Sequence, residues 1–300
     1  MSKFGFVAVL GKANAGKSTL VNSMVGEKVS IVSWKPQTTR NNIKGILTGE
    51  DHQIVFVDTP GIHNAKNSLS RFMMRSVEAA ADNVDLVLYV VNGEKYLTFE
   101  EVKSINDLCK KYKVIVVTNK QDAADKEKLM ANLAKLNEVE NAVDFITVSA
   151  LKKINLDTLL KLILNNLEDG EPLYDEDTYT DSSMRFMAAE IIREKALKNL
   201  DEEVPHGIGV DIVEFKERED GITEINADLY CEKDAHKVII IGKGGQTLKK
   251  ISTQARLEME RLFDAKIYLQ IWVRVKQNWR ASDLNTALLG YNKKIFEDKK

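Results

Sequence analysis

The segment of this 300-residue chain that points most directly to chemistry is GKANAGKS, residues 11–18. It fits G-x-x-x-x-G-K-[ST], the P-loop pattern, in which backbone N–H groups cradle phosphates, the lysine reaches the β- and γ-phosphates, and the hydroxyl binds Mg²⁺. An apolar stretch over residues 4–10 predicts a strand before it, and residues 19–25 predict a helix whose N-terminus favours anions. Chance matches to the bare pattern occur in roughly one unrelated chain per hundred of this length. The segment therefore predicts a nucleoside triphosphate site formed by Gly11, Lys12, Ala13, Asn14, Ala15, Gly16, Lys17 and Ser18.

A second polar segment, DTPG, follows a predicted strand over residues 53–57. The Asp58 carboxylate at the end of that strand can hold Mg²⁺ through water, and Gly61, which has no Cβ, lets the backbone approach the γ-phosphate. Alone this segment is a weak signal, because most such sequences are turns. Together with the P-loop it predicts nucleotide contacts from Asp58, Thr59, Pro60, Gly61 and the following Ile62.

The segment NKQD, which follows a predicted strand over residues 113–118, indicates the base. The Asp122 carboxylate, two residues after Lys120, can accept hydrogen bonds from N1–H and the N2 amino group of guanine. Adenine offers neither donor in that arrangement and would leave a buried carboxylate unpaired, which is costly. The guanine contacts are therefore expected from Asn119, Lys120, Gln121 and Asp122.

A third segment, SAL, follows a predicted strand over residues 144–148, and one of its backbone N–H groups could reach guanine O6 from Ser149, Ala150 or Leu151. SAL alone carries no information. All of these segments, however, fall at the carboxyl ends of predicted strands, the edge at which open parallel sheets bind ligands. The combination predicts a GTP site in an α/β domain with a mostly parallel sheet and helices on both faces.

This constellation resembles the translation-factor-related GTPases and, within them, the Era-like branch. The loop of that branch reads G-x-x-N-x-G-K-S, and Asn14 is the matching asparagine, although its two neighbours are alanines where the family usually has proline and valine. The branch also carries KPQTTR before its second strand, as this chain does at residues 35–40. The polar residues and the proline of this segment also indicate a loop. The resemblance implies that it is the first switch and that Thr39, in preference to Thr38, closes on Mg²⁺ when GTP is bound.

The residue after Gly61 leaves a gap in the catalytic machinery. In Ras-like GTPases a glutamine there orients the attacking water, but this chain has Ile62, which cannot do so. Ile62 can be interpreted as a buried apolar plug beside the nucleotide, or as a sign of slow hydrolysis that another group assists. The resemblance implies that a potassium ion held partly by Asn14 assists, in a catalytic set with Lys17, Thr39 and Gly61.

Composition favours a cytoplasmic protein with two domains. A chain of 300 residues is long for one domain, its net charge is −2 and 29% of its residues are charged. The two cysteines, Cys109 and Cys231, lack metal-ligand spacing and are expected to be free thiols in a reducing compartment. We expect no signal peptide, and the longest apolar run, residues 84–91, is too short to span a membrane. A monomer is expected.

The domain boundary is predicted at residues 168–181, EDGEPLYDEDTYTD, where seven of fourteen residues are acidic and none is basic. Blocks of like charge are usually solvated, so a linker is favoured over a regulatory contact. The expected organisation is a GTPase domain over residues 1–168, an acidic linker over residues 169–181, and a smaller α+β domain over residues 182–300.

The second half predicts the order helix, strand, strand, helix, helix, strand. A helix over residues 184–200 precedes a hairpin, and helices over residues 235–241 and 246–263 precede a last strand over residues 267–275. That strand alternates without a break, so one of its faces is core and the other carries Tyr268, Gln270, Trp272 and Arg274.

Between the last two helices lies a Gly-x-x-Gly segment, GKGG at residues 242–245. Residues without side chains let a loop press against a sugar-phosphate backbone, and KH modules clamp about four nucleotides of single-stranded RNA or DNA in this way. GxxG alone is a very weak signal, but in this element order the region resembles a type II KH domain. Residues 233–280 carry eleven Lys or Arg against four Asp or Glu, which favours phosphate binding. The expected RNA contacts are Gly242, Lys243, Gly244, Gly245, Lys249, Lys250 and Arg256.

The Era-like resemblance extends from Gly5 to Tyr291 and includes an NWR segment around Trp279, for which a packing role is favoured over base stacking. It implies a GTP-hydrolysing switch that binds the 3′ end of small-subunit ribosomal RNA and assists small-subunit assembly. It also implies peripheral association with the inner face of the cell membrane.

Two other functions are compatible with parts of this sequence. A metabolic P-loop kinase is disfavoured by NKQD with SAL, and by the lack of any feature of a phosphate-acceptor pocket. A signalling GTPase whose second domain binds a protein is disfavoured by the basic helix pair around GxxG, and it stands as the alternative.

Overall fold

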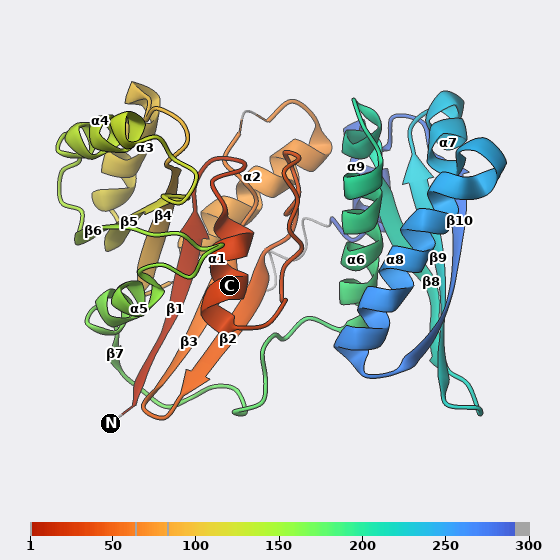
Figure 1. Ribbon diagram of the computed structural model, residues 1–300, viewed down its shortest axis with the longest axis horizontal. Coiled ribbons are helices and arrows are strands. Elements are labelled where there is room, and N and C mark those ends of the chain that lie inside the picture. Colours follow the sequence, from red (N-terminus) through yellow and green to blue (C-terminus); the bar gives the residue numbers. More distant parts are fainter. Residues whose placement is uncertain (1, 64, 83, 292–300) are drawn as a thin grey trace. The chain divides into compact units, whose positions relative to one another are not determined.

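The computed structural model describes residues 2–63, 65–82 and 84–291 of the chain (Figure 1). The chain divides into two compact units. The first unit comprises residues 1–32, 39–64 and 73–181, and the second comprises residues 33–38, 65–72 and 182–300.

The first unit is built on a sheet of seven strands in the order β2-β3-β1-β4-β5-β6, with β7 also paired to β1. Strand β2 is antiparallel to β3 and β7 to β1, whereas the other pairs are parallel. Near-continuous apolar runs form the buried strands, as expected where both faces of a parallel sheet are covered. The strands are β1 (Lys3–Leu10), β2 (Ile43–Gly49), β3 (His52–Asp58), β4 (Leu86–Asn92), β5 (Val114–Asn119), β6 (Asp144–Thr147) and β7 (Glu168–Asp169).

Helices cover both faces of this sheet, which confirms the predicted fold class (Figure 1). Residues of α1 and α5 share one core cluster with β1, β3, β4 and β5. Residues of α2, α3 and α4 share another with the opposite sides of β1, β4 and β5. The helices are α1 (Lys17–Val25), α2 (Ser68–Ala81), α3 (Phe99–Cys109), α4 (Lys126–Leu136) and α5 (Leu156–Leu164).

The acidic segment after β7, which is predicted to be a solvated linker, is mostly exposed, and two side chains of the first unit hold it. The buried Gln53 side chain accepts hydrogen bonds from the backbone N–H groups of Leu173 and Tyr174 at 2.8 and 2.9 Å. Lys44 forms an ion pair with Asp181 at 2.6 Å. Gln53 of β3 and Lys44 of β2 therefore anchor the acidic segment to the sheet, although both lie more than a hundred residues before it in sequence.

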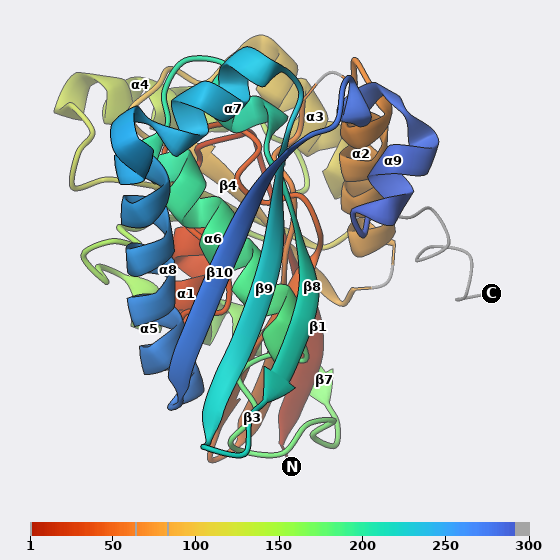
Figure 2. The same cartoon turned by 90° about the vertical axis from the view of Figure 1, so that its right-hand side faces the viewer.

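The second unit has the predicted order of elements around a three-stranded sheet, β10-β9-β8 (Figure 2). Strand β9 is parallel to β10 and antiparallel to β8. One face of the sheet packs with the helices into a single core. The elements are α6 (Met184–Asn199), β8 (Gly209–Glu217), β9 (Ile222–Cys231), α7 (Asp234–Ile241), α8 (Gln246–Phe263), β10 (Lys266–Val275) and α9 (Asp283–Leu288).

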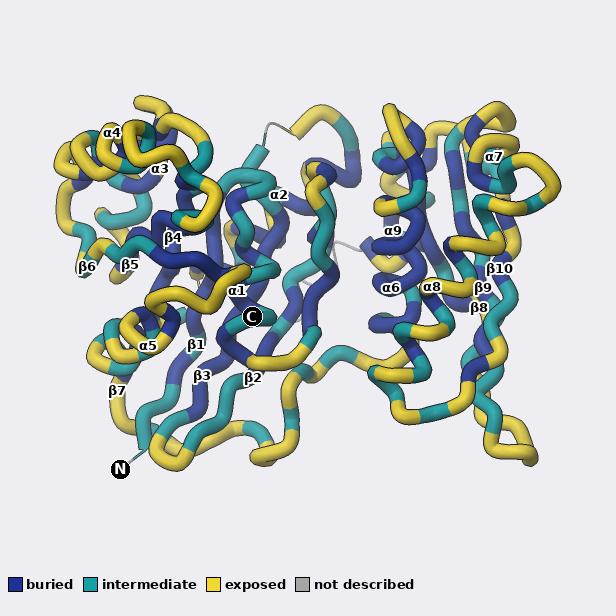
Figure 3. The backbone as a smooth tube through the Cα atoms, viewed as in Figure 1, coloured by how far each residue is buried: buried dark blue, intermediate teal, exposed yellow. Residues whose placement is uncertain are grey.

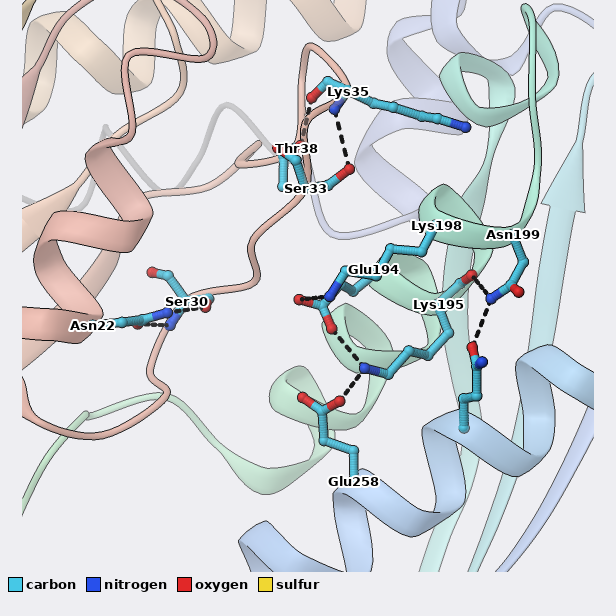
Figure 4. Close-up of polar contacts among 11 residues, drawn as sticks. Asn22, Ser30, Ser33, Lys35, Thr38, Glu194, Lys195, Lys198, Asn199 and Glu258 are labelled. Atoms are coloured by element: carbon cyan, nitrogen blue, oxygen red, sulfur yellow. Dashed lines mark hydrogen bonds and ion pairs between the residues drawn. The ribbon is translucent and has the colours of Figure 1, made fainter. Parts of the chain in front are cut away.

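Helix α6 is largely buried although it carries several charges (Figure 3). Glu194 is fully buried between Lys195, at 2.9 Å, and Lys198, at 3.2 Å. Lys195 also donates to Glu258 of α8 (Figure 4). Buried charges are tolerated only when paired, so this network ties α6 to α8 and would be costly to break on one side.

The end of the described chain confirms the packing role of Trp279. Its ring is fully buried and stacks on Tyr291 at a centroid distance of 6.1 Å, and its Nε1–H donates to the Gly207 carbonyl at 2.8 Å. Helix α9 ends at Leu288, and Gly290 shortly after it has a φ of 84° that only glycine adopts readily.

Candidate nucleotide and RNA sites

The P-loop joins β1 to α1 at the carboxyl edge of the sheet. Gly11 and Gly16 have φ values of 141° and 92°. A Cβ on Gly11 would lie 2.3 Å from the Val90 carbonyl oxygen, and one on Gly16 would lie 2.3 Å from Asn119 Nδ2. Both positions therefore require glycine for conformation and for space, and the loop they form precedes the positive end of α1.

Lys17 is the buried cation of this loop. Its Nζ donates to the carbonyl oxygens of Gly11 and Lys12, both at 3.1 Å. Burial lowers the pKa of Lys17 to about 8, and the nearby Asp58 charge opposes that shift. An ammonium held by neutral carbonyls is poised to gain from an added phosphate charge.

Three oxygen-bearing side chains meet beside the start of α1. Ser18 Oγ lies 2.6 Å from Asp58 Oδ2 and 2.8 Å from Thr39 Oγ1, and Thr39 Oγ1 lies 3.3 Å from the same carboxylate oxygen. Burial raises the pKa of Asp58, against the hydrogen bond from Ser18 and the charge of Lys17. The other oxygen, Asp58 Oδ1, is buried without a hydrogen-bond partner among the described residues.

Thr38 is not part of this group. Its hydroxyl donates to the Lys35 carbonyl at 2.6 Å, within the loop shown in Figure 4. Thr39 is thus the threonine of KPQTTR that lies beside Ser18 and Asp58.

The DTPG segment returns to the P-loop. The Ile62 N–H donates to the Gly11 carbonyl at 3.0 Å, and its side chain packs against the core on one face of the sheet. A Cβ on Gly61 would lie 2.7 Å from Ala13 Cα, so the two loops touch there. The Thr59 hydroxyl points away from this contact and donates to the Val9 carbonyl at 2.7 Å.

His63 follows this contact and was not singled out from the sequence. Its Nδ1 lies 2.7 Å from the Gly61 carbonyl oxygen, which can only accept, so Nδ1 carries the proton. In the neutral ring Nε2 is then an acceptor, and it is buried without a partner in the described part of the chain. The only hint of this position in the sequence is that a histidine directly follows Ile62, the residue that stands where Ras-like GTPases have a glutamine.

The predicted base-binding segments are brought together by Asn119. Its Nδ2 donates to the Ala15 carbonyl at 3.1 Å, and its Oδ1 accepts from the Ala150 N–H at 3.0 Å. Asp122 Oδ1 accepts from the Ser149 hydroxyl at 2.5 Å. Hydrogen bonds thus join NKQD, SAL and the P-loop. The Ala150 N–H already donates to Asn119 Oδ1, so a contact with guanine O6 would have to share this donor.

The flanking residues of these segments have other contacts. Lys120 forms an ion pair with Glu94 at 2.5 Å, and the Gln121 N–H donates to the Val148 carbonyl at 3.2 Å. Leu151 is 72% exposed.

In the second unit, the GKGG loop lies between α7 and α8. Gly244 and Gly245 have φ values of 58° and 77°, and a Cβ on either would meet no atom within 4 Å. Both therefore keep a backbone surface open to an approaching chain. Lys243, Lys249 and Lys250 are exposed beside it, whereas the predicted contact Arg256 is paired with Glu260 at 2.7 Å.

Two apolar side chains next to this loop were not predicted as site residues. Val238 and Ile239 of α7 are 70% and 49% exposed. They belong to the apolar run before GKGG, which indicates a helix but does not indicate which of its side chains face solvent.

Across residues 2–63, 65–82 and 84–291, no three His, Cys, Asp or Glu side chains gather into a group that could hold a metal ion. None of the helices in that part of the chain is both long and apolar enough to cross a membrane. Cys109 and Cys231 are free thiols.

Family models match both units. The model described as a 50S ribosome-binding GTPase matches residues 6–120, and a KH domain model matches residues 203–280.

Relatives match over almost the full length. The chain is 46% identical over 292 residues to GTPase Era of Clostridium novyi and 47% identical over 300 residues to GTPase Era of Clostridium perfringens, with at least 97% of each chain covered. Two solved structures are each 36% identical in sequence to this chain. Aquifex aeolicus Era bound to GDP·AlF4⁻ matches with a TM-score of 0.92, covering 97% of this chain and 99% of that one. Era in complex with MgGDPNP and nucleotides 1506–1542 of 16S ribosomal RNA matches with a TM-score of 0.93, covering 97% and 100%.

Proposed function

The chain belongs to the Era family of GTPases, and from this premise we propose that it is a GTP-driven switch that binds the 3′ end of small-subunit ribosomal RNA during assembly of that subunit. The observation that carries the proposal is its similarity to an Era that holds MgGDPNP and a 16S ribosomal RNA segment together. The division of labour we propose is a GTPase domain over residues 1–168, a linker over residues 169–181 and an RNA-binding domain over residues 182–300. We propose a cytoplasmic location for this activity.

At the nucleotide, each group would act through charge and position. The P-loop backbone and Lys17 hold the phosphates, and the Gly61 backbone approaches the γ-phosphate. Asp122 accepts from two donors of guanine, and Asn119 keeps the base-binding segments joined to the P-loop. Negative charge develops on the phosphate oxygens in the transition state of hydrolysis. Hydrogen-bond donors that are already in position stabilise this charge and so accelerate the reaction.

The residues beside α1 fit a magnesium ion. The Ser18 and Thr39 hydroxyls and the Asp58 carboxylate are hard oxygen donors that already lie 2.6 to 3.3 Å apart. The buried, unpartnered Asp58 Oδ1 supplies a further acceptor that a cation would satisfy. A bound Mg²⁺ would neutralise charge on the β- and γ-phosphates.

Potassium activation is a further part of the proposal. Ile62 packs into the core and cannot orient water, and the P-loop contains no arginine. Asn14, in the left-handed region at φ 63°, is the residue we assign to the potassium ion. Hydrolysis should be faster in potassium than in sodium buffer, and Asn14→Ala should remove the difference while GTP still binds. Equal rates in the two salts at saturating Mg²⁺ and GTP would exclude this assignment.

The RNA function has a direct experiment. The purified chain is crosslinked to total RNA, and the bound fragments are sequenced with and without a non-hydrolysable GTP analogue. We expect enrichment of the 3′ end of small-subunit ribosomal RNA. Crosslinks spread evenly over abundant RNAs would leave only non-specific phosphate binding, and a protein-binding second domain would then be favoured.

A further inference from the structure

The loop that leads to Thr39 belongs to the second unit, an arrangement that the proposed function does not explain. Residues 33–38, which include the first four residues of KPQTTR, group with residues 182–300. Thr39 returns to the first unit, where its hydroxyl lies beside Ser18 and Asp58. The chain therefore passes from one unit to the other at the peptide bond between Thr38 and Thr39. A group that holds this peptide bond can place the Thr39 hydroxyl.

Arg193 of α6 binds the carbonyl of this peptide bond. Its guanidinium donates through Nη2 to the Thr38 carbonyl oxygen and through Nε to Glu190 Oε1 at 2.8 Å. The side chains of Arg193 and Glu190 are only 1% and 7% exposed. Because a peptide group is planar, a guanidinium that fixes the Thr38 carbonyl also fixes the direction in which the chain enters Thr39.

Stability alone does not explain the buried pair of Arg193 and Glu190. Burying an ion pair costs desolvation that its attraction barely offsets, and a well-packed apolar pair of similar volume is often at least as stabilising. The pair does fix the guanidinium in a defined orientation, because Nε and Nη2 donate to the two oxygens of the Glu190 carboxylate. The other N–H of Nη2 is thereby directed at the Thr38 carbonyl.

Lys35 anchors the other end of the same loop. Its buried Nζ donates to the Leu200 carbonyl at the C-terminal end of α6 and pairs with Asp201 at 3.2 Å. The helix dipole favours a cation at that end. Within the loop, the Lys35 N–H donates to Ser33 Oγ at 3.1 Å, and the Thr38 hydroxyl donates to the Lys35 carbonyl at 2.6 Å (Figure 4). Both anchors therefore act on one folded turn.

We infer that Arg193 is a positioning residue for GTP hydrolysis, because it holds the Thr38 carbonyl so that the Thr39 hydroxyl faces the Mg²⁺ ion. The inference rests on the proposed function, in which Thr39 closes on Mg²⁺ when GTP is bound. The RNA-binding unit thus supplies a side chain that acts on the nucleotide reaction through Thr39. Loss of this side chain should weaken binding of a GTP analogue with Mg²⁺ and leave GDP binding unchanged, since GDP does not bring Thr39 onto the metal.

The test uses the full chain and compares nucleotide affinity with Mg²⁺ dependence. Calorimetry at saturating Mg²⁺ gives the affinities for GDP and for GDPNP, a GTP analogue that is not hydrolysed. Arg193→Gln should lower GDPNP affinity at least about fivefold, a typical coupling between two sites, and keep GDP affinity. The Mg²⁺ concentration for half-maximal GTP hydrolysis should rise by a similar factor.

Arg185→Gln is the matched control for this variant. Arg185 lies on the same helix and also donates to a backbone carbonyl, that of Ile212 in β8. Its replacement should change neither affinity, because that carbonyl does not lead to Thr39. Circular dichroism verifies that each variant is folded.

Two further variants separate positioning from folding. Lys35→Met removes the second anchor without leaving a buried carboxylate unpaired, so it should cause the same selective loss of GDPNP affinity, and it decides alone if Arg193→Gln does not fold. In a double-mutant cycle with Thr39→Ala, neither Arg193→Gln nor Lys35→Met should cause a further loss, because the hydroxyl that they position is already absent.

Three results would overturn the inference. They are equal losses of GDP and GDPNP affinity, losses that add to that of Thr39→Ala, and unchanged affinities in both Arg193→Gln and Lys35→Met. An unaltered chain that binds no GTP, or that hydrolyses it without Mg²⁺, would instead contradict the proposed function.

Discussion

The P-loop and the GKGG loop both place glycines directly before a helix, α1 in the first unit and α8 in the second. In the P-loop, a Cβ on Gly11 or Gly16 would collide with protein atoms at 2.3 Å, because the loop is bonded to the segments around it. In the GKGG loop, a Cβ on Gly244 or Gly245 would meet nothing within 4 Å.

The same residue type thus serves two needs. In our proposal, the nucleotide, a small ligand of fixed shape, is held by loops that are hydrogen-bonded to one another, and a few strong interactions provide the affinity. The flexible RNA strand is held by the exposed glycine backbone and by separate lysines around it. Variants of the first site should produce large and specific effects, and variants of the second should produce smaller, additive ones.

Asp122→Asn should give the largest effect. It removes two charge-assisted hydrogen bonds to guanine, worth about 1.5–3 kcal/mol each, so GTP affinity should fall at least about a hundredfold. Affinity for xanthosine triphosphate should rise, because its C2 oxygen accepts where guanine donates. Titration calorimetry with both nucleotides measures this. Asp125→Asn is the control, since Asp125 is exposed and its ion pair in the described part of the chain is with Lys128 at 2.8 Å. GTP affinity that is unaltered in Asp122→Asn would remove the guanine assignment.

The low pKa of Lys17 predicts a pH effect of intermediate size. Bound phosphates favour the charged ammonium, so below a pKa of about 8 the lysine is charged in both states, and above it binding must take up a proton. GTP affinity should therefore fall about fourfold from pH 7 to 8.5. Calorimetry in two buffers of different ionisation enthalpy should detect proton uptake at pH 8.5. Affinity independent of pH, with no uptake, would show that Lys17 is not the phosphate contact.

The lysines beside the GKGG loop should produce the smallest effects. Lys249→Ala should weaken RNA binding about threefold and reduce the salt slope by about 0.7, the value for one phosphate contact on a single strand. Arg256→Ala should change neither quantity, because Arg256 is already paired with Glu260 at 2.7 Å. Anisotropy titrations over a series of salt concentrations compare the two. An equal loss in both variants would mean that the ion pair opens on binding.

Local signals were sufficient to predict the motif-bearing loops. Each of them is a short run of residues between a strand and a helix or between two helices, and its chemistry is readable without knowledge of the rest of the chain. The alternation of core and solvent-facing side chains along β10 was predictable as well, because it too is a local pattern in the sequence.

Features that depend on distant partners could not be predicted. Gln53 of β3 holds the acidic segment through the backbone of Leu173 and Tyr174, more than a hundred residues later. Glu258 of α8 forms an ion pair with the buried Lys195 of α6. The exposure of Val238 and Ile239 and the vacant acceptor of His63 likewise follow from the packing around them.

The central claim is that one chain carries a closed GTP site and a separate open RNA site, and Gly244→Asp tests it most directly. The added carboxylate would stand where a phosphate must approach, so sterics and Coulomb repulsion both oppose RNA binding. Gly221→Asp is the matched control, because Gly221 lies in the β8–β9 turn, has a φ of 75° and also has no atom within 4 Å of an added Cβ.

Both affinities are measured on the same folded preparations, with Mg²⁺-GTP and with the 3′ fragment of small-subunit ribosomal RNA. We predict that Gly244→Asp loses at least about tenfold in RNA affinity, or about 1.4 kcal/mol, and keeps its GTP affinity, whereas Gly221→Asp keeps both. RNA affinity unchanged by Gly244→Asp would contradict the claim, because GKGG would then be only a turn between two helices.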